Sequence, residues 1–294
     1  MTIIDGKALS EKIKSEIAQE VEKIKKGGGK IPHLAAVLVG DNPASKVYVR
    51  NKTRSCEKVG FKSTLVRKGA GVTEQELIET VHALNNDDDI DGFIVQLPLP
   101  KHINEEKITL AIDPKKDVDG FHPVNFGRMA LGLPCYLPAT PFGIVTMLER
   151  YGIETSGKHA VIVGRSNIVG TPMSILLSRK AKVGNCTVTI THSRTQGLSG
   201  ILRQADIIVA AIGIPNFIKK DMVQKGAVVI DVGINRVEDA SRKRGYRLVG
   251  DVDYEAVAPL CSYITPVPGG VGPMTVTSLL LNTLKASRKE VYGS

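Results

Sequence analysis

The sequence predicts an α/β protein made of two domains, each built around a parallel β-sheet. Short apolar runs of strand length alternate with segments of helical periodicity, which is the pattern of strand–helix–strand units. The alternation is interrupted by an irregular stretch over residues 113–140 that is rich in turn residues. With 294 residues and 42% hydrophobic composition, the chain can fill two cores. We therefore expect one domain over 1–139 and a second over 140–274, with a final helix over 275–294 that packs back on the first.

Hydrophobic periodicity defines the elements of the first domain. Apolar residues recur every three or four positions over 7–26, which predicts an amphipathic helix. Thr73 and Glu76 form a capping-box pattern that opens another helix. The remaining expected elements are strands over 34–39, 61–66 and 92–97 and a helix over 43–59.

A second alternating series follows the irregular stretch. Pro141 suits the first position of a helix, so a helix is expected to begin at Thr140–Pro141. Runs rich in β-branched residues predict buried strands of a parallel sheet. The expected elements are strands over 159–163, 187–191, 207–211, 228–232 and 263–267, a helix over 170–179, and a closing helix that contains Val276, Leu279, Leu280, Thr283 and Leu284.

The composition excludes several classes of protein. No apolar run approaches the ~20 residues that span a bilayer, and the amino terminus lacks the basic-then-apolar order of a signal peptide. We therefore expect a cytoplasmic protein with no membrane partner. The chain has a net charge of +9 and no tryptophan. The basic clusters at 23–26 and 242–244 are interpreted as solvated surface or as an aid to binding a small polyanion. A nucleic-acid partner is not expected, because no aromatic stacking surface accompanies them.

The cysteines and histidines indicate neither a disulfide framework nor a metal site. The four cysteines are far apart, and no C-x-x-C pair occurs. Disulfides would fit a secreted chain, whereas free and partly buried thiols fit a cytosolic one, and we favour the second interpretation. The six histidines are scattered without ligand spacing, so no metal is expected. The cysteines are Cys56, Cys135, Cys186 and Cys261.

A strand, a glycine-rich turn and a helix start follow one another over 160–172, the context in which a dinucleotide pyrophosphate meets backbone N–H groups. Ser166 occupies the second glycine position, so the match is imperfect, and such turns are common. The next strand ends without the carboxylate that binds the ribose of NAD, while Ser193 and Arg194 suit a 2′-phosphate. Together with Arg165 this favours NADP over NAD, unless both arginines are only solvated.

A possible reaction centre combines the second expected helix with the end of the third expected strand. Ser45, Tyr48 and Lys52 are three and four residues apart, so they share one helix face. A tyrosine beside a lysine can stack a flat ring and present an amine, which acts as acid or base near neutral pH only if its pKa is lowered. Gln96 could orient this amine or only cap nearby backbone. On its spacing alone, the trio is better interpreted as an ordinary polar helix surface.

Two aspartates and three glycine turns complete the candidates. Asp117 and Asp119 could form a turn before a glycine, or one of them could bind the amino-pyrimidine donors of a ligand. Gly213 and Gly233 follow expected strands and would let backbone approach a nicotinamide, although strand-exit turns often contain glycine. The loop over 268–275 allows a similar close approach, or is simply stiff.

Five motifs that are weak singly become specific when they occur together in this order. They are Tyr-Val-Arg-Asn-Lys at 48–52, Val-Gln-Leu-Pro-Leu-Pro at 95–100, Lys-Asp-Val-Asp-Gly at 116–120, Gly-Arg-Ser-Asn-Ile-Val-Gly at 164–170 and Pro-Gly-Gly-Val-Gly-Pro-Met-Thr at 268–275. The combination closely resembles the bifunctional methylenetetrahydrofolate dehydrogenase and methenyltetrahydrofolate cyclohydrolase family, over essentially the whole chain. The connection over 179–187 looks a few residues longer than is usual in the family, which bears on the placement of Ser193.

The resemblance implies a role for each matched position. Lys52 would be the catalytic lysine and Gln96 would modulate its protonation. Tyr48 would stack against the folate and Asp119 would bind the pterin, which completes the expected catalytic set. The expected contacts to the cofactor NADP are Gly164, Arg165, Ser166, Ser193 and Ile234, and further folate-lining residues are Gly269, Gly270 and Val271.

The resemblance also implies the reaction and its setting. It implies an N-terminal catalytic domain and a Rossmann-like NADP-binding domain, oxidation of 5,10-methylenetetrahydrofolate with NADP, and hydrolysis of the methenyl product to 10-formyltetrahydrofolate. The enzyme would serve one-carbon metabolism and purine biosynthesis as a cytoplasmic homodimer joined through its nucleotide domains. Three alternatives stay open: a dehydrogenase without the hydrolytic step, another two-domain NADP oxidoreductase of the shikimate dehydrogenase kind, and a folate or nucleotide sensor without turnover.

Overall fold

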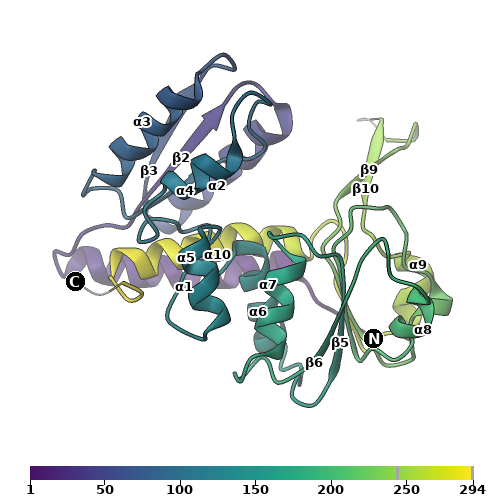
Figure 1. Cartoon of the computed structure of the whole chain (residues 1–294). Helices are drawn as coiled ribbons and strands as arrows, with labels where there is room; N and C mark the ends of the chain where they lie inside the picture. The colour runs from purple at the N-terminus through teal and green to yellow at the C-terminus, as the bar shows by residue number, and fades with distance from the viewer. Residues whose placement is uncertain (243–244, 293–294) are drawn as a thin grey trace. The chain divides into compact units, whose positions relative to one another are not determined.

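The computed structural model describes residues 1–242 and 245–292. It confirms a two-domain α/β fold with parallel sheets. Lys243 and Arg244, which belong to one expected basic cluster, lie outside the described residues. The three-stranded unit comprises Glu11–Ala139 and Val276–Ser294, and the six-stranded unit comprises Met1–Ser10 and Thr140–Thr275 (Figure 1).

The three-stranded unit is a parallel sheet in the order β3-β2-β4 with helices packed against it. The central strand β2 is buried at every position, because neighbouring strands and helices cover it on all sides. One apolar cluster joins β2 and β4 to the buried side of α3, including Phe93 and Val81. The elements are α1 (Gly6–Lys26), which begins in the other unit, β2 (His33–Val39), α2 (Pro43–Val59), β3 (Lys62–Lys68), α3 (Glu74–Asn85), β4 (Gly92–Val95), α4 (Glu105–Ala111), α5 (Pro123–Ala130) and α10 (Val271–Ser287), which also begins in the other unit.

The six-stranded unit is a parallel sheet in the order β1-β11-β8-β7-β5-β6. Figure 1 shows α6 and α7 on one face and α8 and α9 on the other, with the β9–β10 hairpin extending away from the sheet. The elements are β1 (Thr2–Ile3), α6 (Ala139–Arg150), β5 (His159–Val163), α7 (Gly170–Ser178), β6 (Thr187–Thr191), α8 (Leu198–Leu202), β7 (Ile207–Ala210), β8 (Val228–Asp231), β9 (Asn235–Glu238), β10 (Tyr246–Val249), α9 (Tyr254–Val257), β11 (Tyr263–Ile264) and the short 3-10 turns Lys220–Met222 and Ala258–Leu260.

Two sequence-based expectations are corrected by the structure. Residues Met1–Ser10 cluster with the six-stranded unit rather than with the first domain, because β1 pairs in parallel with β11. The stretch over 113–140, expected to be irregular, contains helix α5. His122 caps this helix by accepting from the Val124 N–H, and Pro123 follows at its first turn.

The described residues give no sign of a metal site or a membrane span. All four cysteines are free thiols. In the described part of the chain, no cluster of histidine, cysteine and carboxylate side chains could hold a metal ion. Within the same ranges, no helix is both long and apolar enough to cross a bilayer.

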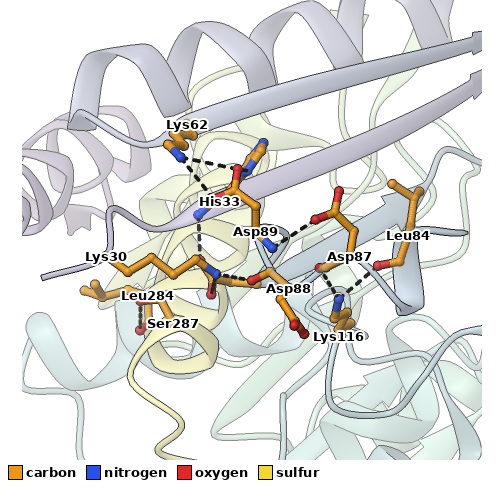
Figure 2. A network of polar contacts seen from close by, with 11 residues as sticks. Lys30, His33, Lys62, Leu84, Asp87, Asp88, Asp89, Lys116, Leu284 and Ser287 are labelled. Carbon is orange, nitrogen blue, oxygen red and sulfur yellow. Dashed lines mark hydrogen bonds and ion pairs between the residues drawn. The ribbon is translucent and has the colours of Figure 1, made fainter.

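The amino-terminal edge of the three-stranded sheet carries a network of ion pairs (Figure 2). Lys62, at the start of β3, contacts the Asp89 carboxylate at 3.0 Å, and the Nδ1 atom of His33 lies 2.9 Å from the same carboxylate. Lys30 donates to the Asp91 carboxylate at 2.7 Å. Lys116 donates to the backbone carbonyls of Leu84 and Asp87. The network ties the turn between α3 and β4 to the starts of β2 and β3.

Candidate active site

Lys52 and Gln96 meet at the carboxyl-terminal edge of the three-stranded sheet. Lys52 lies in α2 with only 9% of its surface exposed. Its Nζ donates to the Oε1 of Gln96 at 3.2 Å. Gln96 is the residue after β4, and its own Nε2 donates to the Leu97 carbonyl at 2.7 Å, which leaves the amide oxygen facing the lysine. This hydrogen bond is the contact that an orienting role of Gln96 requires.

The electrostatic surroundings of Lys52 weaken its preference for the charged form. Burial lowers the pKa of Lys52, and the negative charge of Asp119 opposes this effect only in part. Burial likewise raises the pKa of the half-buried Asp119, and the charge of Lys52 opposes that shift. Among the described residues no carboxylate forms an ion pair with Lys52. The lysine is thus held by a neutral amide, with a carboxyl group near enough to influence it electrostatically.

The turn that carries Asp119 is fixed from inside the unit. The buried Asp117 carboxylate accepts from the His122 N–H at 2.8 Å and from the Asn125 Nδ2 at 2.9 Å. Gly120 has φ 75°, and a Cβ atom there would stand 2.6 Å from backbone atoms of Leu137, so only glycine fits. Asn282 of α10 donates to the carbonyls of Val118 and Leu137. Asn282 was not singled out from the sequence, because nothing local marks a polar residue on an otherwise apolar helix as a contact to a turn more than 140 residues away.

Tyr48 lies one helical turn before Lys52 and is 46% exposed. Ser45 and Cys56, on the same face of α2, are 3% and 0% exposed. Burial raises the pKa of the Cys56 thiol to about 12, so this thiol is neutral. The face that carries Lys52 is therefore mostly buried, and Tyr48 presents an accessible ring at its border.

The turn after β5 has the geometry of a phosphate-binding loop. A Cβ atom on Gly164, which has φ 120°, would lie 2.3 Å from the Ala211 carbonyl oxygen, and one on Gly170 would lie 2.3 Å from the Gly164 carbonyl oxygen. The Ser166 hydroxyl accepts from the Val169 N–H at 3.2 Å. Arg165 and Ser166 are exposed. The two glycines let β5 and α7 pack closely, and the turn presents a cation and a hydroxyl at the helix start.

Ser193 lies at the same sheet edge as this turn. Val163 of β5 pairs with Thr191 of β6, and the Gly164 N–H donates to the Thr191 carbonyl at 2.9 Å. The long connection over 179–187 does not shift this register, because it closes on itself through the Asn185 N–H, which donates to the Arg179 carbonyl at 2.9 Å. The connection is thus held in a local turn before β6 begins.

Ile234 and the loop over 269–271 lie near each other in the six-stranded unit. Ile234, 48% exposed, follows β8, and its Cδ1 lies 3.6 Å from the Cβ position that Gly272 would have. Gly269 has φ 108°, and Gly270 and Val271 are buried at the start of α10. A Cβ atom on Gly6 would lie 1.8 Å from the Gly270 carbonyl oxygen, so the turn after β1 packs directly on this loop. The sequence signal for Gly6, a turn-forming Asp5-Gly6 pair, is present but local.

The carboxyl edge of the six-stranded sheet fits NADP. The strand order places β5 between β6 and β7, which is the switch point where α/β sheets of this kind bind nucleotides. The turn at this point offers backbone N–H groups and the exposed Arg165. The neighbouring β6 ends in Thr191 and is followed by the exposed Ser193 and Arg194, without a carboxylate that would repel a 2′-phosphate.

Two family sequence models match the chain, and together they cover both units. Residues 4–119 match the sequence model described as "Tetrahydrofolate dehydrogenase/cyclohydrolase, catalytic domain". Residues 138–291 match the model of the NAD(P)-binding domain of the same family. The chain belongs to the tetrahydrofolate dehydrogenase/cyclohydrolase family.

Relatives of this family resemble the chain over its full length. A protein of Bacteroides thetaiotaomicron named bifunctional protein FolD is 61% identical over 99% of this chain and 100% of its own. A Campylobacter jejuni crystal structure of the bifunctional enzyme FolD, methylenetetrahydrofolate dehydrogenase/cyclohydrolase, superposes with a TM-score of 0.93 at 47% identity and covers 99% of both chains. A Trypanosoma brucei enzyme, complexed with NADP and an inhibitor, gives a TM-score of 0.92 at 37% identity and covers 99% of this chain and 98% of that one.

Proposed function

We infer that this protein oxidises 5,10-methylenetetrahydrofolate with NADP and hydrolyses the resulting 5,10-methenyltetrahydrofolate to 10-formyltetrahydrofolate. The observation that carries the hydrolytic half is the buried Lys52 amine, hydrogen-bonded to the neutral Gln96 and free of an ion pair among the described residues. Burial lowers the pKa of this lysine, which makes its proton easier to give up. Family membership and the fit of the six-stranded unit to NADP support the oxidative half.

Lys52 is proposed as the group that moves protons in the hydrolytic step. Water adds to the methenyl carbon, and the neutral amine accepts the proton that this water gives up. The C–N5 bond of the adduct then breaks as the ammonium returns a proton to N5, while the adduct's hydroxyl loses its proton to solvent and becomes the formyl oxygen. Gln96 keeps the amine oriented through both transfers without adding a negative charge.

The other residues of the three-stranded unit are proposed to bind the folate. Asp119 is a half-buried carboxyl group on a rigid turn, suited to the amino and ring N–H donors of the pterin. Tyr48 offers an exposed ring beside Lys52 for stacking. The rigid loop of Gly269, Gly270 and Val271, which belongs to the six-stranded unit, is proposed as a further folate-lining segment.

The six-stranded unit is proposed to hold and orient NADP. When bound, NADP supplies the acceptor for the hydride that leaves the one-carbon bridge. Gly164 and Ser166 would bind the pyrophosphate at the start of α7. Arg165 and Ser193 would contact the 2′-phosphate, and the exposed Ile234 would pack against the nicotinamide.

We further propose that the protein is a cytoplasmic homodimer joined through its nucleotide-binding units. Four free thiols among the described residues suit a reducing compartment, and the resemblance to the family supports the dimer. The product is a formyl donor, which supports a role in one-carbon metabolism and purine biosynthesis.

The proposed activity is tested by mixing the protein with methylenetetrahydrofolate and NADP and following NADPH and methenyltetrahydrofolate together. NADPH that forms without matching build-up of the methenyl compound is the expected result. Stoichiometric methenyl build-up would leave a dehydrogenase alone. If folded protein gave neither signal, the sensor or another NADP oxidoreductase would take the place of this proposal. The same assay with NAD in place of NADP checks the cofactor, and the oxidation is expected to be much slower.

A further inference from the structure

Two buried aspartates lie under the turns at the carboxyl edge of the six-stranded sheet. They have no role in the site described so far. Asp231 ends β8 and is 3% exposed, and Asp251 follows β10 and is 0% exposed. Neither forms an ion pair with a lysine or arginine in the described ranges of the chain. Burial raises the pKa of Asp231 to about 6, although backbone N–H groups that bind the carboxylate counteract the effect. Both carboxylates are therefore held by neutral donors alone.

Asp251 connects the turns that follow two neighbouring strands. Its Oδ2 accepts from the N–H groups of Ile212 and Gly213, after β7, at 2.7 and 2.9 Å. Its Oδ1 accepts from the Nδ2 of Asn235, after β8, at 2.9 Å. One carboxylate thus fixes the spacing between the two turns.

Asp231 fixes the second turn and Asp251 itself. Its Oδ1 accepts from the N–H groups of Gly233 and Asp251 at 3.0 and 2.9 Å, and its Oδ2 accepts from the Val252 N–H at 3.0 Å. A Cβ atom on Gly250 would lie 1.8 Å from Asp231 Oδ2, and one on Gly233 would lie 2.3 Å from Asp251 Oδ1. The carboxylates occupy the space that these glycines leave, so a side chain at either glycine would displace one of them.

These hydrogen bonds hold the backbone on both sides of Ile234. The residue before it, Gly233, is bound through its N–H to Asp231, and the residue after it, Asn235, is bound through its side chain to Asp251. The exposed Ile234 is therefore presented from a backbone that is clamped on both sides.

The strand order indicates which half of NADP these turns would meet. The proposed 2′-phosphate contacts follow β5 and β6, whereas the clamped turns follow β7 and β8, on the opposite side of the switch point. A dinucleotide bound across the switch point has its adenosine half on one side and its nicotinamide half on the other.

We propose that Asp251 and Asp231 are positioning residues for the nicotinamide half of NADP, acting through Gly213, Gly233 and Ile234. This rests on the proposed NADP-dependent function. The pair holds the nicotinamide ring at a fixed depth and angle for hydride transfer, and contributes nothing directly to the adenosine half or to proton transfer at Lys52.

The test is Asp251→Asn, which keeps the size of the side chain but removes one acceptor. Its amide oxygen can accept from the N–H groups of Ile212 and Gly213 only without the negative charge, and its Nδ2 then meets Asn235, whose own amide must turn over to accept, so both anchors are weakened. The matched control is Asp253→Asn, two residues on, where the side chain is 32% exposed and binds Lys219.

Four quantities are measured by calorimetry and steady-state kinetics: the Kd for NADP, the kcat of the dehydrogenase, the Kd for adenosine 2′,5′-bisphosphate, and the cyclohydrolase rate on methenyltetrahydrofolate without NADP. For Asp251→Asn, we expect the Kd for NADP to rise about tenfold, with kcat of the dehydrogenase reduced. The other two quantities should stay within about twofold of wild type, as all four should in Asp253→Asn.

Equal weakening of NADP and of adenosine 2′,5′-bisphosphate would overturn the proposal, as would wild-type values for both. If Asp251→Asn does not fold, Asn235→Ala removes the link to the second turn alone and should show the same selectivity with a smaller effect. A wild-type protein that binds neither probe would instead refute the proposed NADP-dependent function, which separates the two failures.

Discussion

Lysines at the two edges of the three-stranded sheet differ in exposure and in the group that they contact. At the amino edge, Lys62 and Lys30 are about half exposed, and each contacts a carboxylate (Figure 2). At the carboxyl edge, Lys52 is 9% exposed and contacts an amide. The pKa of Asp89 is lowered, mainly by its hydrogen bond to Lys62. The pKa of Asp119 is raised by burial, although Lys52 is near.

The difference separates lysines that anchor segments from the lysine proposed to transfer protons. A solvated lysine beside a carboxylate stays charged and holds two segments together, at a modest gain in stability. A desolvated lysine beside a neutral amide loses part of its preference for the charged form, so its proton becomes available. The amino edge tightens the turn before β4, and the residue after β4 carries the amide that faces Lys52.

The largest expected effect comes from exchanging one lysine at each edge. Lys52→Met should lower the cyclohydrolase rate by at least about 100-fold, because the proton-transfer group is lost. Some hydride transfer should persist, because that step needs alignment rather than the amine. Lys62→Met is the control and should leave both rates within about twofold of wild type. Equal retention of both activities in Lys52→Met would remove the amine from the mechanism.

Gln96→Glu should make the carboxyl edge resemble the amino edge. A carboxylate in place of the amide favours the charged form of Lys52 and raises its pKa. The pH at which the cyclohydrolase rate rises should then move upward by on the order of one unit, with a rate at pH 7 reduced about tenfold. The pH–rate profile measures the shift, and Gln75→Glu, on an exposed face of α3, is the matched control. An unchanged profile would show that Gln96 does not set the proton affinity of Lys52.

The sequence predicted much of this fold because local signals and tertiary structure agree in it. The apolar run of β2 is buried at every position, and the Thr73–Glu76 capping box opens α3 as its pattern indicates. Helix α5 was missed because its short segment, with Gly127 inside, reads as turn sequence. Its cap is a histidine, which is rarely read as a helix start. The place of β1 depends on pairing with β11, more than 250 residues away, and no local pattern encodes that.

The residues of the site likewise divide into those that a local pattern marks and those that only distant contacts define. Three and four residue spacing on α2 placed Tyr48 and Lys52 on one helix face. Gln96 could be named from the sequence as a possible partner of Lys52. The sequence alone favoured a backbone cap over this role, because an amide at a strand end commonly caps nearby backbone. Asn282 and Asp251 were not singled out, since their donors and acceptors lie on distant turns. Residues that act by holding backbone in place carry no motif of their own.

Asp117 sharpens the comparison through the pH dependence of stability. Burial raises the pKa of Asp117 to about 7, above its ordinary value of 3.8. The folded state therefore binds this proton more tightly than the unfolded state does. Its contribution to the free energy of unfolding declines as pH rises from about 4 to 7, by on the order of 1 kcal/mol per pH unit at its steepest. In Asp117→Asn this slope should disappear from urea unfolding measured across that range, whatever the stability at a single pH. An unchanged slope would place the titration elsewhere.

The smallest effect, and the one of opposite sign, is expected at the amino edge. The pKa of Asp89 is lowered, so its contribution to stability is present above the ordinary carboxyl range and is lost as pH falls through the lowered value. Because Asp89 and Lys62 are about half exposed, salt screens their attraction. Lys62→Met should therefore lower the melting temperature slightly at low ionic strength, and the difference from wild type should vanish near about 1 M salt. A difference that survived in high salt would mean that Lys62 stabilises the edge through the hydrogen bonds of its ammonium group to Asp89 rather than through screened charge attraction, and the contrast with Lys52 would then rest on burial alone.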